Sequence, residues 1–192
     1  MMLRSATDPA WFETSARDLG GLLSDHLHCE RKAAENALSL VRRYPSDGAL
    51  VLQLARLAHE ETSHVVQVAA LLERRGLALR PDSPNRYARG LREAMRGREP
   101  EHRLDALLCA ALIEARSHER LGLLAAGFAA RGDGVLADFY RALASAEERH
   151  AELYVELASQ GGAAVSAQAR LAELAAHEAQ VLAALPASCR VH

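Results

Sequence analysis

The sequence contains the same four-residue motif twice, as Glu61-Thr-Ser-His64 and as Glu147-Glu-Arg-His150. A lone glutamate precedes each copy at a similar distance: Glu30 lies 31 residues before the first motif, and Glu114 lies 33 residues before the second. Residues three apart on an α-helix lie on the same face, so the glutamate and the histidine of each motif can reach one point. The pattern predicts two similar helix pairs, each carrying a glutamate and then Glu-x-x-His.

Helical periodicity of the apolar residues extends over most of the chain. The long segments with this period are 20–44, 48–76, 101–130, 134–160 and 164–185. Asp8-Pro9 predicts a further helix at the start of the chain, because Asp is a good N-cap and Pro suits the first helical position. Gly161, Gly162 and Pro186 are expected to end the last two long segments.

The connections between these segments indicate the fold class. Short connections follow the first and third long segments, whereas residues 77–100 form one long connection between the second and third. This order predicts an all-α, ferritin-like four-helix bundle with one long crossover between helices 2 and 3, plus extra N- and C-terminal helices. A length of 192 residues suits a single domain over residues 1–192.

The repeated motifs lie within the apolar stripes of their helices. Alternating steps of four and three residues give Leu50, Leu54, Leu57, Glu61, His64, Val68 and Leu71 on one helix, and Leu136, Tyr140, Leu143, Glu147, His150, Tyr154 and Leu157 on another. Several buried carboxylates at one level would repel one another and would lose their hydration. Two metal ions among them remove both costs, and iron, zinc or manganese would fit these donors. The predicted metal ligands are Glu30, Glu61, His64, Glu114, Glu147 and His150.

Other polar side chains near the motifs have simpler explanations. A single Glu-x-x-His is more often a solvated pair or a helix cap, and it is the repetition in matching stripes that favours a metal site. Glu60 and Glu148 fall outside the stripes, so solvated positions are expected for them. For Glu35 and Glu119 a surface or salt-bridge role is favoured over a contact to a ligand, and for His118 a place in the core or beside a ligand is favoured over ligation. Tyr140 and Tyr154 are expected to fill the core, with a redox role as the less favoured alternative. Five histidines have no matched partner and are expected to be exposed: His26, His28, His59, His102 and His177.

Charge is uneven along the chain. The formal net charge is only −2, but residues 74–103 hold nine arginines and four acidic residues. Helical spacing would place Arg89, Arg92 and Arg96 on one face, which suits contacts to phosphates, and an aromatic residue among arginines can stack on unpaired bases. On composition alone, a solvated and salt-bridged connection explains this segment slightly better.

Cysteine usage and hydropathy indicate the cellular compartment. Cys29, Cys109 and Cys189 are far apart and form no CxxC motif, which is typical of a reducing cytoplasm. The N-terminus has no basic region followed by an apolar run, and no apolar stretch reaches the length of a membrane span. A cytoplasmic protein with no membrane partner is expected.

Five segments resemble the MiaE-type tRNA hydroxylases, and together they lie within about residues 8–160. They are His28–Ala34, Glu60–His64, Ser83–Arg92, Ile113–Arg120 and Phe139–His150. The resemblance implies that the six predicted ligands hold two iron ions and that O₂ is a co-substrate. The implied reaction is hydroxylation of the isopentenyl side chain of 2-methylthio-N6-isopentenyl-adenosine beside the anticodon in tRNA. His118 occupies a position where the family has Cys, which argues further against its being a ligand.

The resemblance also implies the partners. It favours tRNA binding through the anticodon loop, and the residues expected to contact tRNA are Arg86, Tyr87, Arg89, Arg92 and Arg96. Two electrons must come from an external donor, a ferredoxin or a flavoprotein reductase, because the chain has no flavin, haem or Fe–S motif. The oligomeric state, monomer or small oligomer, stays open.

Three other functions fit part of the pattern. A ferritin- or bacterioferritin-like ferroxidase that stores iron would use the same ligands, but it does not explain the arginine-rich crossover. A rubrerythrin-like peroxidase commonly adds a CxxC…CxxC module, which is absent from this sequence. The protein could also be a helical interaction module without metal, in which case the buried glutamates would have no role in function.

Overall fold

The computed structural model describes residues 2–160, 164–185 and 191. Within them the chain forms seven α-helices and no strand, which confirms the predicted all-α class. The helices are α1 (Ala10–Ser15), α2 (Leu19–Arg43), α3 (Gly48–Arg74), α4 (Arg86–Arg92), α5 (Glu101–Ala130), α6 (Gly134–Ser159) and α7 (Ala164–Ala184). Gly161, Gly162, Pro186 and Cys189 lie outside the described residues. None of the helices in the described parts of the chain is long and apolar enough to cross a membrane.

The chain divides into two compact units, each built on one pair of long helices. One unit contains residues 13–83, with α2 and α3, together with Val191. The other contains residues 2–12 and helices α4 to α7. That residues 1–192 form one ferritin-like domain stays a prediction.

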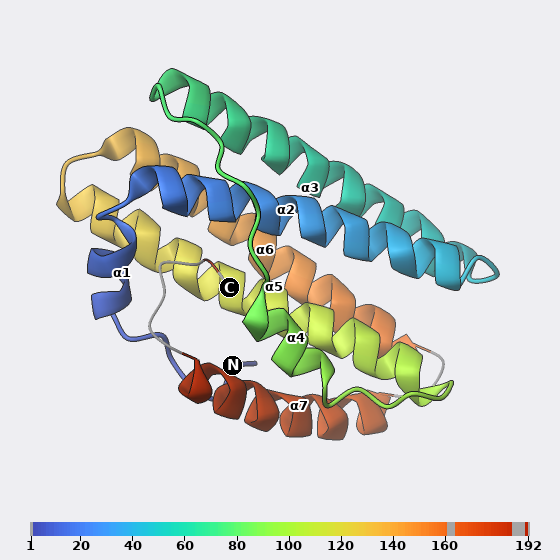
Figure 1. The fold of residues 1–192 in the computed structure, drawn as a ribbon. Coiled ribbons are helices and arrows are strands. Elements are labelled where there is room, and N and C mark those ends of the chain that lie inside the picture. Colours follow the sequence, from blue (N-terminus) through green and yellow to red (C-terminus); the bar gives the residue numbers. More distant parts are fainter. Residues whose placement is uncertain (1, 161–163, 186–190, 192) are drawn as a thin grey trace. The chain divides into compact units, whose positions relative to one another are not determined.

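Helices α2 and α3 lie side by side and run in opposite directions (Figure 1). Each begins at an aspartate whose carboxylate accepts a hydrogen bond from the first turn: Asp18 from the Gly21 amide and Asp47 from the Leu50 amide. All seven predicted stripe residues of α3 are buried, including Glu61 and His64. The stripe therefore positions these two polar side chains inside the protein.

Helices α5 and α6 form the second antiparallel pair (Figure 1). The turn between them contains Gly132 at φ +78°, a left-handed conformation that favours glycine, and Asp133 then caps α6 through the Leu136 amide. The predicted stripe of α6 is buried along its whole length, so Glu147 and His150 also lie in the interior. Phe128 of α5 stacks on Tyr140 of α6 with ring centroids 5.8 Å apart.

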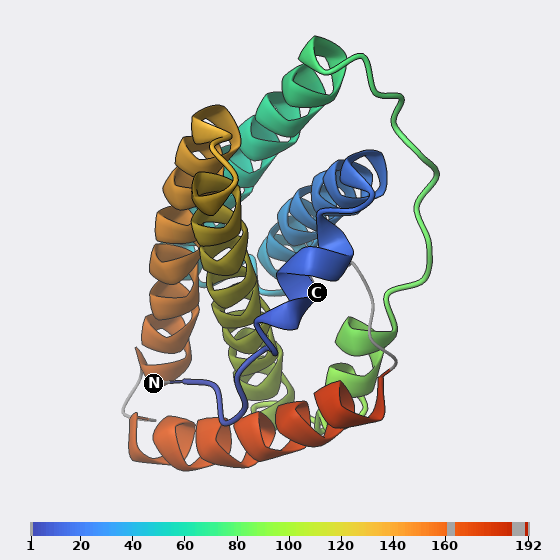
Figure 2. The ribbon, with the colours of Figure 1, turned by 90° about the vertical axis from the view of Figure 1, so that its left-hand side faces the viewer.

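Helix α7 packs across the α5/α6 pair and against α4 (Figure 2). A buried ion pair joins it to α5: Arg116 Nε and Nη2 donate to Glu178 Oε1 at 3.0 and 2.9 Å, and neither side chain is exposed. Tyr87 of α4 donates its hydroxyl to the same Oε1 at 2.9 Å. At Gly90 a Cβ would lie 2.9 Å from the Val181 side chain, so glycine allows the close approach of α4 to α7.

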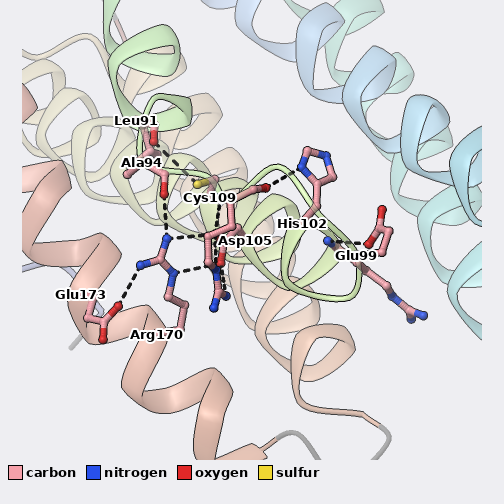
Figure 3. A network of polar contacts seen from close by, with 10 residues as sticks. Leu91, Ala94, Glu99, His102, Asp105, Cys109, Arg170 and Glu173 are labelled. Atoms are coloured by element: carbon pink, nitrogen blue, oxygen red, sulfur yellow. Dashed lines mark hydrogen bonds and ion pairs between the residues drawn. The ribbon is translucent and has the colours of Figure 1, made fainter.

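A second polar network holds the end of the crossover (Figure 3). Asp105 is fully buried and accepts hydrogen bonds from the side chains of Arg96 and Arg170. Burial alone would raise the pKa of Asp105, but the hydrogen bonds from the two arginines outweigh it and lower the pKa to about 2. The carboxylate therefore stays ionised and pairs with both arginines.

This network corrects one expectation about the crossover. Helix α4 ends at Arg92, so helical spacing does not carry Arg96 onto the face of Arg89 and Arg92. The backbone amide of Arg96 donates to Asp105 Oδ2 at 2.8 Å and not to a carbonyl of a preceding turn. The backbone has left the helix at that point, and the Asp105 carboxylate accepts the Arg96 amide in place of a helical carbonyl.

Candidate metal centre

Helices α2 and α3 bring three of the predicted ligands together. Glu30, Glu61 and His64 are 3%, 0% and 5% exposed, and one ligand-capable atom of each lies within 4.8 Å of the others. His64 Nδ1 is 3.3 Å from Glu30 Oε2 and 3.5 Å from Glu61 Oε2. Two carboxylates and one imidazole thus surround a small volume inside this unit.

The electrostatics of this cluster favour a positive charge. Burial would raise the pKa of Glu30, but hydrogen bonds from His26 and His64 outweigh it and hold the pKa well below its ordinary value. Burial would lower the pKa of His64, but its contacts with the Glu30 and Glu61 carboxylates outweigh burial and raise the pKa to about 10. The two carboxylates therefore retain a proton on the imidazole. A metal ion bound by the same atoms would displace that proton, because a ligating imidazole is neutral.

Helices α5 and α6 carry the matching set. Glu114, Glu147 and His150 are only 2–3% exposed, as buried as their counterparts. His150 Nδ1 is 3.8 Å from Glu147 Oε2. That oxygen is buried and accepts no hydrogen bond from the described residues. A buried carboxylate oxygen without a donor is costly unless a cation contacts it.

The donor chemistry of both helix pairs fits a metal centre. Each pair supplies two glutamates and one histidine, all buried. Carboxylate oxygen and imidazole nitrogen are ligands of divalent iron, manganese and zinc, so the residues suit a metal site without selecting one metal.

One residue of the α2/α3 cluster was missed by the sequence analysis. The prediction that His26 is exposed is wrong: it is 1% exposed, and its Nε2 lies 2.6 Å from Glu30 Oε1. His26 and Glu30 are four residues apart and so share a face of α2, and this spacing could have revealed the contact. Among the other histidines without a matched partner only His59 is exposed; His28, His102 and His177 are half-buried, and each makes a hydrogen bond with a backbone carbonyl.

The remaining polar residues near the motifs lie in ordinary surroundings. Glu35 pairs with Arg31 at the surface, and Glu119 pairs with Arg116 and accepts from the Thr7 hydroxyl. His118 is half-buried, with its Nδ1 2.8 Å from the Ala144 carbonyl. Salt-bridge roles for the two glutamates and a structural position for His118 agree with the favoured expectations.

The predicted tRNA-contacting residues divide into two groups. Arg86, Arg89 and Arg92 are exposed on α4. Tyr87 is buried on the opposite side of the helix, where its hydroxyl donates to Glu178, so a base could stack on its ring only if the ring left this position. Arg96 is exposed but already holds Asp105. The three arginines of α4 are thus the best placed of the five for an RNA contact.

A ferritin-like carboxylate protein is the class that these helices and ligands define. A solved structure supports this class over the whole chain. It is described as protein 43 with aldehyde deformylating oxygenase activity, from Synechococcus, and it matches with a TM-score of 0.91 and 37% sequence identity, covering 100% of this chain and 96% of that one.

Sequence comparisons identify the family within this class. The profile described as tRNA-(MS[2]IO[6]A)-hydroxylase (MiaE) matches residues 1–192, and the chain belongs to this family. A protein of Pseudomonas putida KT2440 is 44% identical over 156 residues, covering 81% of this chain and 74% of the relative. A protein of Salmonella typhimurium LT2 is 33% identical, covering 82% of this chain and 75% of the relative. Both are described as tRNA 2-(methylsulfanyl)-N(6)-isopentenyladenosine(37) hydroxylases, and the resemblance seen in the sequence is confirmed.

Proposed function

We propose that this protein hydroxylates the isopentenyl side chain of 2-methylthio-N6-isopentenyl-adenosine, next to the anticodon of tRNA, in an O₂-dependent reaction. The observation that carries the proposal is the match of the whole chain to the MiaE family. The buried glutamates and histidines of both helix pairs supply the metal-binding chemistry that such a monooxygenase needs.

The proposed metal centre combines the two sets of ligands. In it, Glu30, Glu61 and His64 of α2/α3 and Glu114, Glu147 and His150 of α5/α6 hold two iron ions. When bound, such an iron pair activates O₂ for attack on an unactivated C–H bond. The glutamates balance the charge of the irons, and the apolar residues of the same stripes keep water from the site. Electrons would come from a ferredoxin or a flavoprotein reductase.

The substrate can be tested directly by nucleoside mass spectrometry of bulk tRNA from cells with and without the gene. We expect the isopentenylated, methylthiolated adenosine to lose its added oxygen atom when the gene is removed and to regain it on complementation. An identical nucleoside profile would refute the proposed substrate. Size-exclusion chromatography would then test the ferroxidase alternative, because iron storage in a ferritin requires a large hollow shell. An assay with an aldehyde would test the activity described for the Synechococcus protein.

Arginines of α4 are proposed to contact tRNA phosphates. Replacing Arg89 and Arg92 together by alanine should weaken tRNA binding and reduce the slope of log Kd against log salt by about two, because each lost phosphate contact removes about one unit. Filter binding over a series of salt concentrations measures both quantities. Arg56→Ala, an exposed arginine of α3, is the matched control. A double variant with the wild-type slope would show that these arginines do not contact phosphate.

A further inference from the structure

The carboxylate of Glu30 is held from two sides within its own unit. His26 Nε2 lies 2.6 Å from Oε1, and His64 Nδ1 lies 3.3 Å from Oε2. All three side chains are buried, so water does not compete for these contacts. The two oxygens of one carboxylate therefore have different neighbours.

The identity of those neighbours separates the roles of the two oxygens. Oε2 faces the group that contains Glu61 and His64, where a metal would bind. Oε1 faces His26, which lies one turn earlier on α2. His26 does not belong to the group of side chains that could hold a metal ion. A hydrogen bond of 2.6 Å to a carboxylate is short for a nitrogen donor, which is typical of a strong, charge-assisted contact.

We propose that His26 is a positioning residue that donates its Nε2–H to Glu30 Oε1, so that Glu30 binds metal through Oε2 alone. This inference rests on the proposed metal centre and assigns His26 a role beyond the six ligands. Hydrogen bonds from neighbouring groups commonly fix the orientation of carboxylate ligands and tune their affinity for the metal.

The second helix pair has no equivalent contact at this spacing. The residue four positions before Glu114 on α5 is Ala110, whose methyl group cannot donate a hydrogen bond. The two upstream glutamates therefore differ in the residue four positions earlier, although their spacing to the Glu-x-x-His motifs is nearly the same. His26 constrains Glu30 in a way that Ala110 cannot constrain Glu114.

The test uses the full-length protein, stripped of metal and titrated with Co²⁺, whose visible absorption reports coordination number. His26→Gln places an amide N–H near the position of Nε2, whereas the shorter side chain of His26→Asn does not reach Glu30. His26→Leu removes the donor altogether. We expect the Leu and Asn variants to bind Co²⁺ about 10- to 100-fold more weakly, with an altered spectrum because Glu30 can then bind through both oxygens. The Gln variant should restore most of the affinity and the wild-type spectrum.

His28→Leu is the matched control, because His28 lies two residues away on α2 and its Nε2 lies 2.9 Å from the Arg80 carbonyl oxygen. If the Leu variant does not fold, the comparison of the Gln variant with the Asn variant is sufficient to test the role of His26. Equal affinities and spectra for wild type, Gln and Asn would overturn the inference, as would a Gln variant as weak as Asn. Cobalt binding that depends on His26, in a protein that modifies no tRNA, would reject the proposed substrate and leave the role of His26 intact.

Discussion

Replacing Glu61 or His150 by alanine should remove most of the bound metal and lower tRNA hydroxylation by more than about 100-fold, because loss of a ligand should exceed the effect of losing a neighbouring hydrogen bond. Glu61 is completely buried next to His64, and His150 lies one turn after Glu147. Glu61→Ala removes one carboxylate ligand and its negative charge, and His150→Ala removes one imidazole ligand, so each variant holds the metal with one donor fewer. Metal content per protein, measured by elemental analysis, and the yield of hydroxylated nucleoside check the two effects.

Neighbouring glutamates provide controls for this prediction. Glu60→Ala and Glu148→Ala remove carboxylates that adjoin the motifs but lie outside the buried stripes. Both variants should keep the wild-type metal content. The double variant Glu61→Ala/His150→Ala should be scarcely less active than either single variant, because residues that act as one unit show non-additive effects. Full metal occupancy in both single variants would refute the ligand assignment.

The long helices and the candidate ligands could be predicted because their signals are local. Asp47 and Asp133 are good N-caps, and the stripes of α3 and α6 repeat over seven buried positions each, so the helix starts and the inward direction of Glu61 and Glu147 follow from short stretches of sequence. These features need no knowledge of how distant segments meet.

The contacts that could not be predicted join residues far apart in the sequence. Arg170 pairs with Asp105 across 65 residues, and Tyr87 donates to Glu178 across 91. The arginine-rich stretch with its tyrosine predicts one continuous polar surface. In the structure, however, Tyr87 of α4 is buried and Arg96 forms an ion pair with Asp105. Sequence spacing carries no information about these partners.

The largest effect on stability is expected at the ion pair between Arg116 and Glu178. Neither side chain is exposed, and Arg116 also donates to the Ser5 carbonyl at 3.0 Å. Glu178→Ala would leave the guanidinium buried without its main counter-charge, which typically costs about 3–5 kcal/mol. For a chain of this length that corresponds to a decrease in Tm of roughly 6–20 °C, measured by differential scanning calorimetry.

A matched exposed pair and a double variant separate charge burial from simple loss of contact. Glu173→Ala removes a glutamate that is 66% exposed and pairs with Arg170, and it should cost less than about 1 kcal/mol. Arg116→Met/Glu178→Leu replaces both buried charges by apolar groups and should recover much of the stability lost in Glu178→Ala, because no unpaired charge then remains. If the double variant were less stable than Glu178→Ala, the contacts that Arg116 keeps in Glu178→Ala, such as the hydrogen bond that it donates to the Ser5 carbonyl, would outweigh the cost of the unpaired charge.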